Sequence, residues 1–563
     1  MIVLGLNFYY HDSTACIVID GKLVAAIEEE RLNRDKHTQA FPYLSIDKCL
    51  EIAGINYGDI DHIAISIKPS HNLDKKIKYY LGSKRRWGHY YRWEILRNKG
   101  KIKEFNVWYD KIFINGVKEP KVHFIPHHLC HAPGTFFVSP YDKAAILGID
   151  GSGEWATSWI GYGENNSIEK FGESFFPNSL GSLYEAVTQF CGFKPNYDEG
   201  KTMGLAPMGN PDTYFNEIAS IVKVTKEGDI KIDLDLFQFQ DFKWKNLLSE
   251  KFFKKFGERR DKNGPFEQRH MDMAAAFQKV LEERVLEMCD ILYEKTKTKY
   301  LVIGGGVSLN SVMNGRIVRE SKFEDVYVMP AAGDNGTAIG AAYYLYNGIL
   351  NKPRVFVHDN PYVGTSYTNE EIKKVLNGAK LKHVYHEDIC EVAADLLAKG
   401  KIIGWFQGAM EIGPRALGNR SILANPAFPD MKDKINSEVK FREAYRPFAP
   451  SATVESYQDY FDLEVEAPFM LKVCPVKEDK KTVIPAVTHV DGSARLQTVR
   501  KEINPRYHEL ITALGKRTGV PVVLNTSFNI QGEPVVESPV HAIRCFYSNG
   551  LDALVLGNYL LTK

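Results

Sequence analysis

Two histidines, His127 and His131, stand four residues apart in the stretch His127-His128-Leu129-Cys130-His131-Ala132. If this stretch is helical, both imidazoles lie on one face, one turn apart, where they can share a cation. Pairs with this spacing are more often structural than metal-binding. The interpretation as a metal site therefore needs further ligands elsewhere in the chain.

Two aspartates are candidates for those ligands. Asp150 ends an apolar run, residues 144–149, that we interpret as a buried strand. A carboxylate at the carboxyl end of such a strand points into the crevice where α/β folds bind ligands. Asp334 lies in a glycine-rich turn that follows another short apolar run, residues 326–328. Two nitrogen and two oxygen ligands with open positions suit iron, manganese, cobalt or zinc.

The elements that position these residues follow a repeated pattern of short strands and glycine-rich loops. Residues 2–6 and 15–19 are predicted strands, and Asp20-Gly21 predicts a hairpin after the second. A long helix is predicted from 270 to about 297, with strands at 300–304 and 326–328. One glycine-rich loop is a weak signal, but several, each after a short apolar strand and two of them with an aspartate, predict a two-lobed, actin-like nucleotide-binding fold.

The loops after these strands offer backbone groups to a ligand. Asp150-Gly151-Ser152-Gly153 is similar to a phosphate-binding turn, since its glycines let backbone amides approach an anion. The glycines at 304–306, Gly306 included, allow close approach to a flat or anionic ligand, and Asn310 is predicted to begin the next helix.

Length and composition describe an ordinary globular protein. The 563 residues allow about three or four units, two of which would be halves of a duplicated fold. A net charge of +1 gives no reason to expect a nucleic-acid or membrane surface. Eight cysteines without a Cys-x-x-Cys pair fit a reducing cytoplasm, and neither a signal peptide nor a membrane-spanning run is expected.

The second half predicts a separate domain, residues 369–563, after a linker at 351–368 that is rich in proline, glycine and asparagine. It contains cations that stand among glycines, prolines and short apolar runs: Arg415, Arg420, Lys440, Arg446 and Arg495. This setting favours a cluster that serves an anion, because arginine forks match phosphate oxygens. A solvated basic face or internal ion pairs remain open. Asn525 and Ser527 alternate at a strand end and would point the same way.

Two other stretches have open interpretations. Residues near 70 to 120 are basic and aromatic, with Lys84-Arg85-Arg86-Trp87 and Tyr90-Tyr91-Arg92-Trp93. They would form a lid, an acceptor surface or a solvated helical insertion. The charged loop at 34–37 contains Lys36, which is either a ligand residue or merely solvated.

Taken together, the motifs closely resemble the O-carbamoyltransferase family, which includes antibiotic-tailoring and nodulation-factor enzymes. The motifs, in chain order, are NxxxHDSTA, HHLCHA, IDGSGEW, EGKTMGLAP, GGGVSLN, GDNGTAIGAA, GPRALGNRS, VKFREAYRPFAPS and LNTSFN. The similarity runs along nearly the whole chain and is weakest at about 70–120 and 210–265.

This resemblance implies an α/β fold with an N-terminal two-lobed ASKHA-type domain, residues 1–350, and a C-terminal YrdC-like domain, residues 369–563. In the second domain carbamoyl phosphate would be cleaved, and ATP, with Mg2+ possible, would trap the carbamate as carbamoyl adenylate. The residues that match the family's carbamoyl-phosphate pocket are Arg415, Lys440, Arg446, Arg495, Asn525 and Ser527.

The first domain would then transfer the carbamoyl group to a hydroxyl of a small-molecule acceptor. His127, His131, Asp150 and Asp334 match the family's Fe2+ site, which another divalent metal would also fit. By the same resemblance, Gly306 and Asn310 would hold the adenosine, His11 would bind the acceptor or take its proton, and Lys36 would offset charge on the departing AMP. Compared with the family's aminoglycoside-modifying enzyme, Tyr9-Tyr10 shortens the turn before His11, which argues against an aminoglycoside acceptor. A homodimer is a reasonable expectation.

Three other classes of protein are alternatives to a carbamoyltransferase. An ASKHA sugar kinase would need no arginine-rich second domain. A metallopeptidase would need a glutamate between the two histidines, where the chain has His, Leu and Cys. A non-catalytic nucleotide-binding regulator would not explain two anion sites on separate domains.

Overall fold

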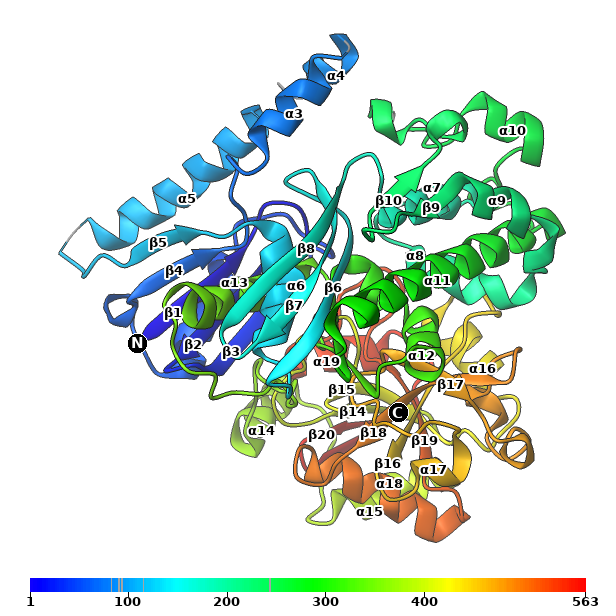
Figure 1. The fold of residues 1–563 in the computed structure, drawn as a ribbon. Helices are drawn as coiled ribbons and strands as arrows, with labels where there is room; N and C mark the ends of the chain where they lie inside the picture. The colour runs from blue at the N-terminus through cyan, green and yellow to red at the C-terminus, as the bar shows by residue number, and fades with distance from the viewer. Residues whose placement is uncertain (83, 90–91, 93–94, 115, 243–244) are drawn as a thin grey trace. The chain divides into compact units, whose positions relative to one another are not determined.

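The computed structural model describes residues 1–563 except 83, 90, 91, 93, 94, 115, 243 and 244. The chain forms two compact units (Figure 1). Unit 1 comprises Met1–Val24 and Gln39–His358, and unit 2 comprises Ala25–Thr38 and Asp359–Lys563. Among the described helices, none has both the length and the apolar character needed to cross a membrane.

Unit 1 contains two five-stranded sheets. The first has the order β3(Lys22–Glu28)-β2(Thr14–Ile19)-β1(Ile2–Asn7)-β4(His62–Ile65)-β5(Lys121–Phe124). The second has the order β12(Asp325–Val328)-β11(Tyr300–Gly304)-β6(Lys143–Gly153)-β7(Ala156–Glu164)-β8(Ser167–Phe175). A separate ribbon pairs β9(Val222–Val224) with β10(Ile230–Ile232).

The two sheets share one topology. In each, the first strand pairs antiparallel with the second, and on its other side it pairs parallel with the fourth strand of that sheet. That fourth strand in turn pairs parallel with the fifth. The duplicated halves expected from the chain length are thus both present, and both lie in unit 1.

Helices complete unit 1. Its described helices are α2(Tyr43–Ala53), α3(Leu73–Tyr80), α4(Lys84–His89), α5(Arg97–Phe113), α6(His127–Phe137), α7(Leu180–Phe190), α8(Glu199–Leu205), α9(Phe215–Ile221), α10(Glu250–Phe256), α11(Gln268–Thr296), α12(Ser311–Glu320) and α13(Thr337–Tyr343). Helix α6 follows the first sheet but packs on β6 and β11 of the second. Helix α13 follows the second sheet but packs on β1 and β4 of the first, so the two helices meet between the sheets.

Glycines allow α6 and α13 to approach closely. A β-carbon added to Gly340 would lie 1.7 Å from the carbonyl oxygen of Cys130, and one added to Gly134 would lie 2.5 Å from the Cα of Gly340. Cys130 lies between the two predicted metal-binding histidines. The packing that holds α6 in place therefore also fixes the positions of those histidines.

We expect Gly340→Ala to destabilise unit 1 by about 3 kcal/mol, because an inserted methyl group forces the backbones of two packed helices apart. Thermal unfolding of the full chain measures this effect. Gly378→Ala, at a helical glycine with nothing within 4 Å of its added β-carbon, is the control and should leave the melting temperature unchanged. An unchanged melting temperature for Gly340→Ala would contradict the close approach.

Unit 2 is built on a nine-stranded sheet. Its order is β13(Val384–Tyr385)-β21(Tyr559–Thr562)-β20(Ala553–Leu556)-β14(Ile403–Phe406)-β15(Arg420–Ala424)-β19(Val522–Ser527)-β16(Ala449–Thr453)-β18(Ser493–Val499)-β17(Lys472–Pro475). The described helices are α1(Glu29–Asn33), α14(Asn369–Gly378), α15(Ile389–Ala398), α16(Met431–Lys434), α17(Tyr457–Tyr460), α18(Pro505–Thr518) and α19(Pro539–Tyr547). Helices α15 and α18 bury one face around Trp405, Val523 and Val555.

The segment 25–38 belongs to unit 2. Arg31 donates a hydrogen bond to the carbonyl oxygen of Gly413, and Arg34 donates to those of Pro534 and Val535, all of them residues of unit 2. The first domain predicted from the sequence, residues 1–350, includes this segment, whereas the structure places it in unit 2. Hydrogen bonds to distant carbonyl groups leave no pattern in a local stretch of sequence.

The predicted strands and the long helix are confirmed to within a few residues. The stretch near 70 to 120 is helical where it is described, as α3, α4 and α5, which leaves its role open. Tyr90, Tyr91 and Trp93, which the sequence analysis singled out there, lie outside the described residues.

Candidate metal centre and buried cation cluster

Four predicted metal ligands converge in unit 1. His127 and His131 occupy the first and fifth positions of α6, Asp150 lies near the end of β6, and Asp334 precedes α13. The two Nε2 atoms lie 2.9 Å apart. Asp334 Oδ1 lies 3.4 Å from His127 Nε2 and 3.3 Å from His131 Nε2, and Asp150 Oδ2 lies 3.5 and 3.7 Å from the same atoms. All four side chains are buried.

These distances fit one divalent cation. Metal–ligand bonds of about 2.0–2.2 Å at tetrahedral or octahedral angles place neighbouring ligand atoms about 2.8–3.6 Å apart. The donor set of two imidazoles and two carboxylates suits borderline transition metals more than calcium or magnesium. The residues present therefore fit the group that the family resemblance implies.

The surroundings of the site fix the ligands in place. Asp150 Oδ1 accepts the backbone N–H of Gly306 at 3.0 Å, and the carbonyl of Asp334 accepts from Asn7 at 2.9 Å. Glu154 accepts the backbone N–H of His127 at 2.9 Å. Such outer contacts orient first ligands and tune their basicity.

Opposite charges shift the protonation of the ligands. Burial raises the pKa of Asp334, but the nearby His11 and His127 hold it well below its ordinary value. Burial lowers the pKa of His127, yet Asp334 and Asp150 raise it well above 6.5. In the protein without an ion, a proton on the imidazole of His127 therefore offsets carboxylate charge, and metal binding must release it.

His11 lies beside the metal centre, as the sequence analysis expected. Its Nε2 lies 3.7 Å from Asp334 Oδ2 and its Nδ1 lies 2.9 Å from Asp12 Oδ2. Burial lowers the pKa of His11, but the charges of Asp334 and Asp12 raise it to about 10. The ring is partly exposed, so a ligand can reach it.

The sequence did not predict three glutamates near the centre: Glu154, which is buried, and Glu185 and Glu199, which are half-buried. Burial and the charge of Glu199 raise the pKa of Glu185 to about 8, and burial raises that of Glu154 to about 7. Glu185 Oε1 lies 3.3 Å from the position that a β-carbon on Gly151 would take. Glu154 and Glu199 stood within the quoted motifs IDGSGEW and EGKTMGLAP, which was the available signal.

The predicted ligand-binding loops adjoin the same centre. Gly151, Ser152 and Gly153 end β6, and a β-carbon on Gly153 would lie 2.1 Å from the ring of His127. Asn310 begins α12, as predicted, since its side chain accepts the backbone N–H of Met313. That side chain also exchanges hydrogen bonds with Gln278.

Unit 2 gathers four of the five predicted cations into one cluster, in which Lys440 is buried and Arg415, Arg446 and Arg495 are half-buried. Burial and the charges of its neighbours lower the pKa of each of three members: that of Arg415 to about 10, that of Arg495 well below 12.5 and that of Lys440 well below 10.5. The neighbours responsible are other cations of the set, Arg446 among them. Like charges this close repel one another unless an anion lies between them.

Several buried polar atoms of the cluster lack partners within the described part of the chain. They are Nε of Arg415, Nε of Arg495 and Oδ1 of Asn525. Buried donors without acceptors are rare in folded proteins, and a bound ligand is a common explanation. Lys440 donates to the carbonyl oxygens of Ser527 and Asn529, which hold its amine but do not neutralise its charge.

Two further arginines have roles that the sequence did not separate. Arg442 joins the cluster, since burial and the charge of Arg446 lower its pKa to about 9. Arg420 does not join it: its guanidinium donates to the carbonyl oxygens of Gln407, Gly408 and Thr365. Arg420 is therefore a structural residue, which corrects its assignment to the anion cluster.

Lys36 lies in unit 2, where its charge contributes to the lowered pKa of Lys440. The family resemblance had placed it beside departing AMP in the first domain. Lys36 therefore lies in the same unit as the cation cluster, close enough for its charge to act on Lys440.

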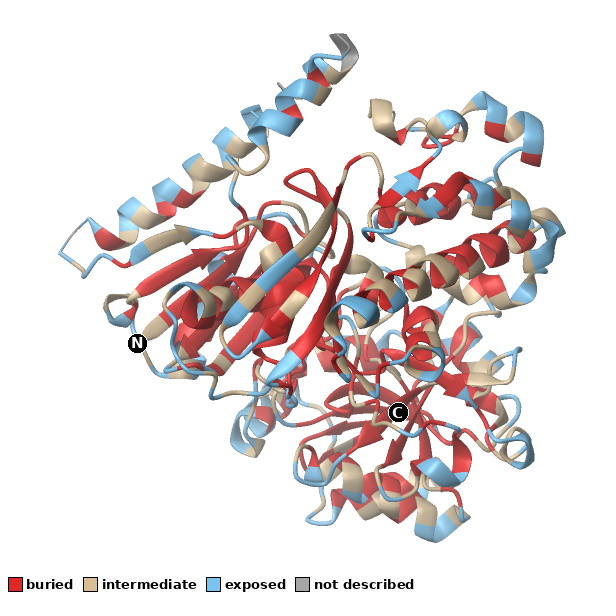
Figure 2. Ribbon diagram, in the orientation of Figure 1, coloured by how far each residue is buried: buried red, intermediate tan, exposed pale blue. Residues whose placement is uncertain are grey.

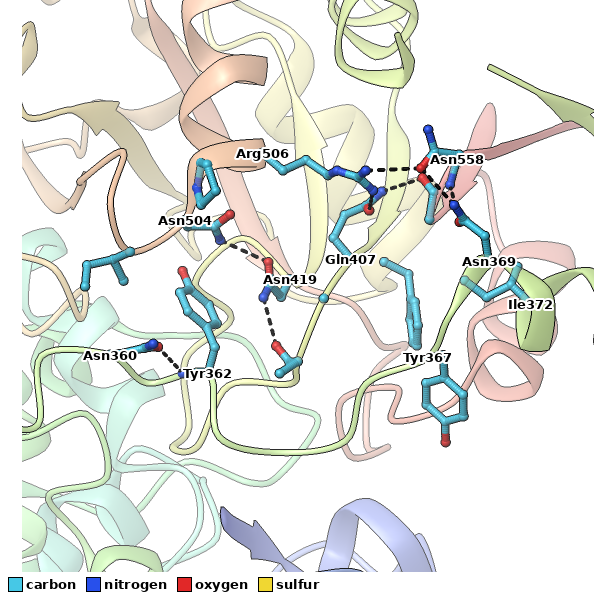
Figure 3. A pocket seen from close by; sticks show the side chains of 16 residues that line it. Asn360, Tyr362, Tyr367, Asn369, Ile372, Gln407, Asn419, Asn504, Arg506 and Asn558 are labelled. Carbon is cyan, nitrogen blue, oxygen red and sulfur yellow. Dashed lines mark hydrogen bonds between the residues drawn. The ribbon is translucent and has the colours of Figure 1, made fainter. Parts of the chain in front are cut away.

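A cavity of about 420 Å³ in unit 2 was not expected from the sequence (Figure 3). Figure 3 shows Arg506 donating to the side-chain oxygens of Gln407 and Asn558, with Tyr362 and Asn419 on the wall below. None of the predicted site residues lines this cavity.

We expect inorganic phosphate to stabilise unit 2, because a dianion relieves repulsion in the cation cluster. Since burial lowers the pKa of Lys440 and of Arg442, the folded protein binds fewer protons than the unfolded chain between about pH 9 and 10.5. Its stability in chloride should therefore rise with pH in that window. Phosphate should raise the melting temperature by about 2–5 °C at pH 7, and by less at pH 9.5.

Thermal unfolding in chloride and phosphate at matched ionic strength measures this difference. Arg495→Leu is the informative variant, since it should abolish most of the stabilisation by phosphate. An equal effect of phosphate on this variant would mean that the anion binds elsewhere.

Comparisons with known proteins show what this chain is similar to. The family models "Carbamoyltransferase N-terminus" and "Carbamoyltransferase C-terminus" match residues 2–343 and 394–563. The nodulation protein NolNO of Sinorhizobium fredii is 38% identical over 99% of this chain and 80% of its own length. The 3'-hydroxymethylcephem-O-carbamoyltransferase of Amycolatopsis lactamdurans is 34% identical over 67% of this chain and 68% of its own.

Solved structures are more distant. Full-length HypF in its phosphate- and nucleotide-bound form matches with a TM-score of 0.32 and 12% identity, over 61% of this chain and 55% of that one. Component A of the Acidaminococcus fermentans (R)-2-hydroxyglutaryl-CoA dehydratase matches with a TM-score of 0.30 and 16% identity, over 61% and 97%. At such scores these similarities support no argument about fold or function.

Two family models together cover most of the chain, and the sequence motifs, the metal centre and the cation cluster all fall within the matched residues. The kinase, peptidase and non-catalytic alternatives are thereby excluded. The chain belongs to the carbamoyltransferase family and is an enzyme of that family, a carbamoyltransferase.

Proposed function

We propose that this enzyme makes carbamoyl adenylate from carbamoyl phosphate and ATP in unit 2 and uses it in unit 1 to carbamoylate a hydroxyl group. The acceptor would be a small molecule such as a sugar, a glycoside or another natural product. In this proposal unit 1 is the ASKHA-like transfer domain and unit 2 is the YrdC-like domain.

The first step would occur in the cation cluster. Water adds to the carbamoyl carbon, the bond from that carbon to the phosphate oxygen breaks, and carbamate and inorganic phosphate form. Arg415, Arg446 and Arg495 would hold the phosphate, whose charge increases as it leaves. Asn525 and Ser527 would orient the neutral amide end. Burial lowers the pKa of Lys440, and the bound dianion would favour its charged form.

The second step would join carbamate to ATP. A carbamate oxygen attacks the α-phosphorus, pyrophosphate leaves, and carbamoyl adenylate remains. Mg2+ with ATP would screen the triphosphate. The same buried cations would hold the reacting oxygens, because a water-poor site strengthens charge interactions and protects the anhydride from hydrolysis.

The transfer step would occur at the metal centre. A divalent cation held by His127, His131, Asp150 and Asp334, Fe2+ or another transition metal, would supply Lewis acidity beside the carbamoyl oxygen. The acceptor oxygen attacks the carbamoyl carbon and AMP leaves. His11 can take the acceptor's proton only once the negative charge of Asp334 is offset, since its pKa is about 10 without an ion.

The observation that carries the proposal is the cation cluster in which the buried Nε atoms of Arg415 and Arg495 have no partner among the described residues. The test is to incubate the purified protein with ATP and carbamoyl phosphate and to assay phosphate, pyrophosphate and the mass of carbamoyl adenylate. Phosphate release without an adenylate would contradict the second step, and no phosphate release would contradict the first.

A further inference from the structure

The stretch from 71 to 118, which we call the basic arm, has a charge quite unlike that of the whole protein. It contains thirteen lysines and arginines against four aspartates and glutamates, whereas the complete chain has a net charge of +1. The remainder of the protein is therefore acidic on balance. A basic segment of this strength on an otherwise acidic protein is expected to seek an anionic partner.

The basic arm is an addition to the duplicated fold. It occupies the crossover between the parallel strands β4 and β5 and contributes α3, α4 and α5. In the second sheet the equivalent crossover, between β11 and β12, contains a short 3-10 turn, Gly306–Leu309, and the ten-residue α12. The fold itself does not require the extra helices, so their role lies elsewhere.

Aromatic side chains fix the inner side of the arm to unit 1. On α5 the buried ring of Trp108 lies 5.3 Å from that of Phe41, and the buried Phe105 stacks on Phe8. On α3 the buried ring of Tyr80 lies 5.3 Å from that of Trp155. The opposite faces of the helices are therefore held outward in a fixed orientation.

The outer faces carry large apolar residues as well as cations. On α3 and at its C-terminal cap, Leu73, Ile77 and Leu81 follow one another at spacings of four, and Leu81 is 67% exposed. On and just before α5 the exposed residues include Leu96, Lys99, Lys103 and Val107, with Val107 57% exposed. Figure 2 shows α3 and α5 coloured mostly as exposed or intermediate along their length.

This combination identifies one kind of partner. Exposed aliphatic side chains interleaved with lysines are typical of helices that lie in a membrane interface, where apolar groups enter the acyl boundary and cations meet anionic headgroups. A nucleic acid would use the cations but leave the leucines in water. We propose that the basic arm binds the surface of a lipid bilayer that contains anionic lipids.

The arm contacts the loop at residues 9–10, which lies next to the candidate metal ligand His127. Arg97, at the start of α5, donates to the carbonyl oxygens of Tyr9 and Tyr10, and the ring of Tyr10 lies 5.2 Å from that of His127. A bilayer bound to the arm would thus lie near the transfer site. If the proposed function holds, the acceptor hydroxyl belongs to a molecule at that surface; the bilayer binding itself does not depend on the proposed function.

Vesicle co-sedimentation of the full chain, without ATP or acceptor, tests the proposal. The protein should bind vesicles containing 30% phosphatidylglycerol and should not bind pure phosphatidylcholine. K78E/K99E/K103E should weaken binding about 100-fold or more. The matched control K373E/K374E/K380E reverses three exposed lysines in and next to α14 of unit 2 and should bind as the parent does.

A second variant separates a bilayer from other polyanions. L81S/V107S keeps every charge and should weaken vesicle binding about tenfold while leaving binding to heparin unchanged. Undiminished vesicle binding by L81S/V107S, or binding of pure phosphatidylcholine by the parent, would overturn the proposal. Equal melting temperatures of the variants and the parent show that they fold, and absence of phosphate release by the parent would contradict the proposed function alone.

Discussion

Replacing Arg495 by leucine is expected to lower phosphate release from carbamoyl phosphate by about 100- to 1000-fold, the usual effect of removing a preorganised charge from a developing anion. Arg495 is central to the cation cluster, since the charges of Arg415, Arg442 and Arg446 all lower its pKa. Its buried Nε has no partner among the described residues and is therefore available to a ligand. The assay measures phosphate at saturating ATP.

Folding and catalysis can be separated for this variant. Burial opposes the charge of Arg495, and leucine removes both that cost and the repulsion, so the variant should unfold at the same temperature as the parent or higher. Arg500→Leu is the matched control, because Arg500 follows the same strand but forms an exposed ion pair with Glu466. A destabilised Arg495→Leu, or normal phosphate release from it, would contradict the anion site.

The convergence of His127, His131, Asp150 and Asp334 could be predicted from the sequence because each of these residues has a local signal. His127 and His131 share a helical spacing, and Asp150 and Asp334 follow apolar strands in glycine-rich turns. In an α/β fold such strand ends converge, so four separate local patterns were enough to predict one site. The structure then supplied the distances that the patterns could not.

The parts that failed depended on long-range contacts. Arg420 and Arg442 stand in similar surroundings in the sequence, yet one donates to backbone carbonyl groups and the other joins the cation cluster. Any residue can supply a backbone carbonyl group, so no sequence pattern distinguishes Arg420 from Arg442. Lys36 is the same kind of case, because its segment leaves unit 1 through contacts that are distant in the chain.

The basic arm shows how an average hides a local property. A net charge of +1 argued against a membrane or nucleic-acid partner, although residues 71–118 alone are strongly basic. The amphipathic pattern of α3 and α5 became interpretable only once the structure showed which aromatic residues face inward. Charge should therefore be evaluated by segment and by face.

Asp150→Asn is expected to remove the metal and to abolish carbamoyl transfer, while phosphate and pyrophosphate release in unit 2 continue. Asparagine can still accept the N–H of Gly306, so the loop should keep its shape. It replaces an anionic ligand by a neutral one, which binds a divalent cation far more weakly. Metal content by elemental analysis should fall below about one tenth of the parent's, and transfer should fall by about 1000-fold.

Carbamoyl adenylate should accumulate in this variant, because it is still made but no longer consumed. Asp290→Asn, the same substitution at an exposed position of α11, is the control and should keep both the metal and the activity. The two variants of Arg495 and Asp150 must fail at different steps, since one lies in unit 2 and the other in unit 1. Failure of both at phosphate release would mean that the two units do not divide the reaction as proposed.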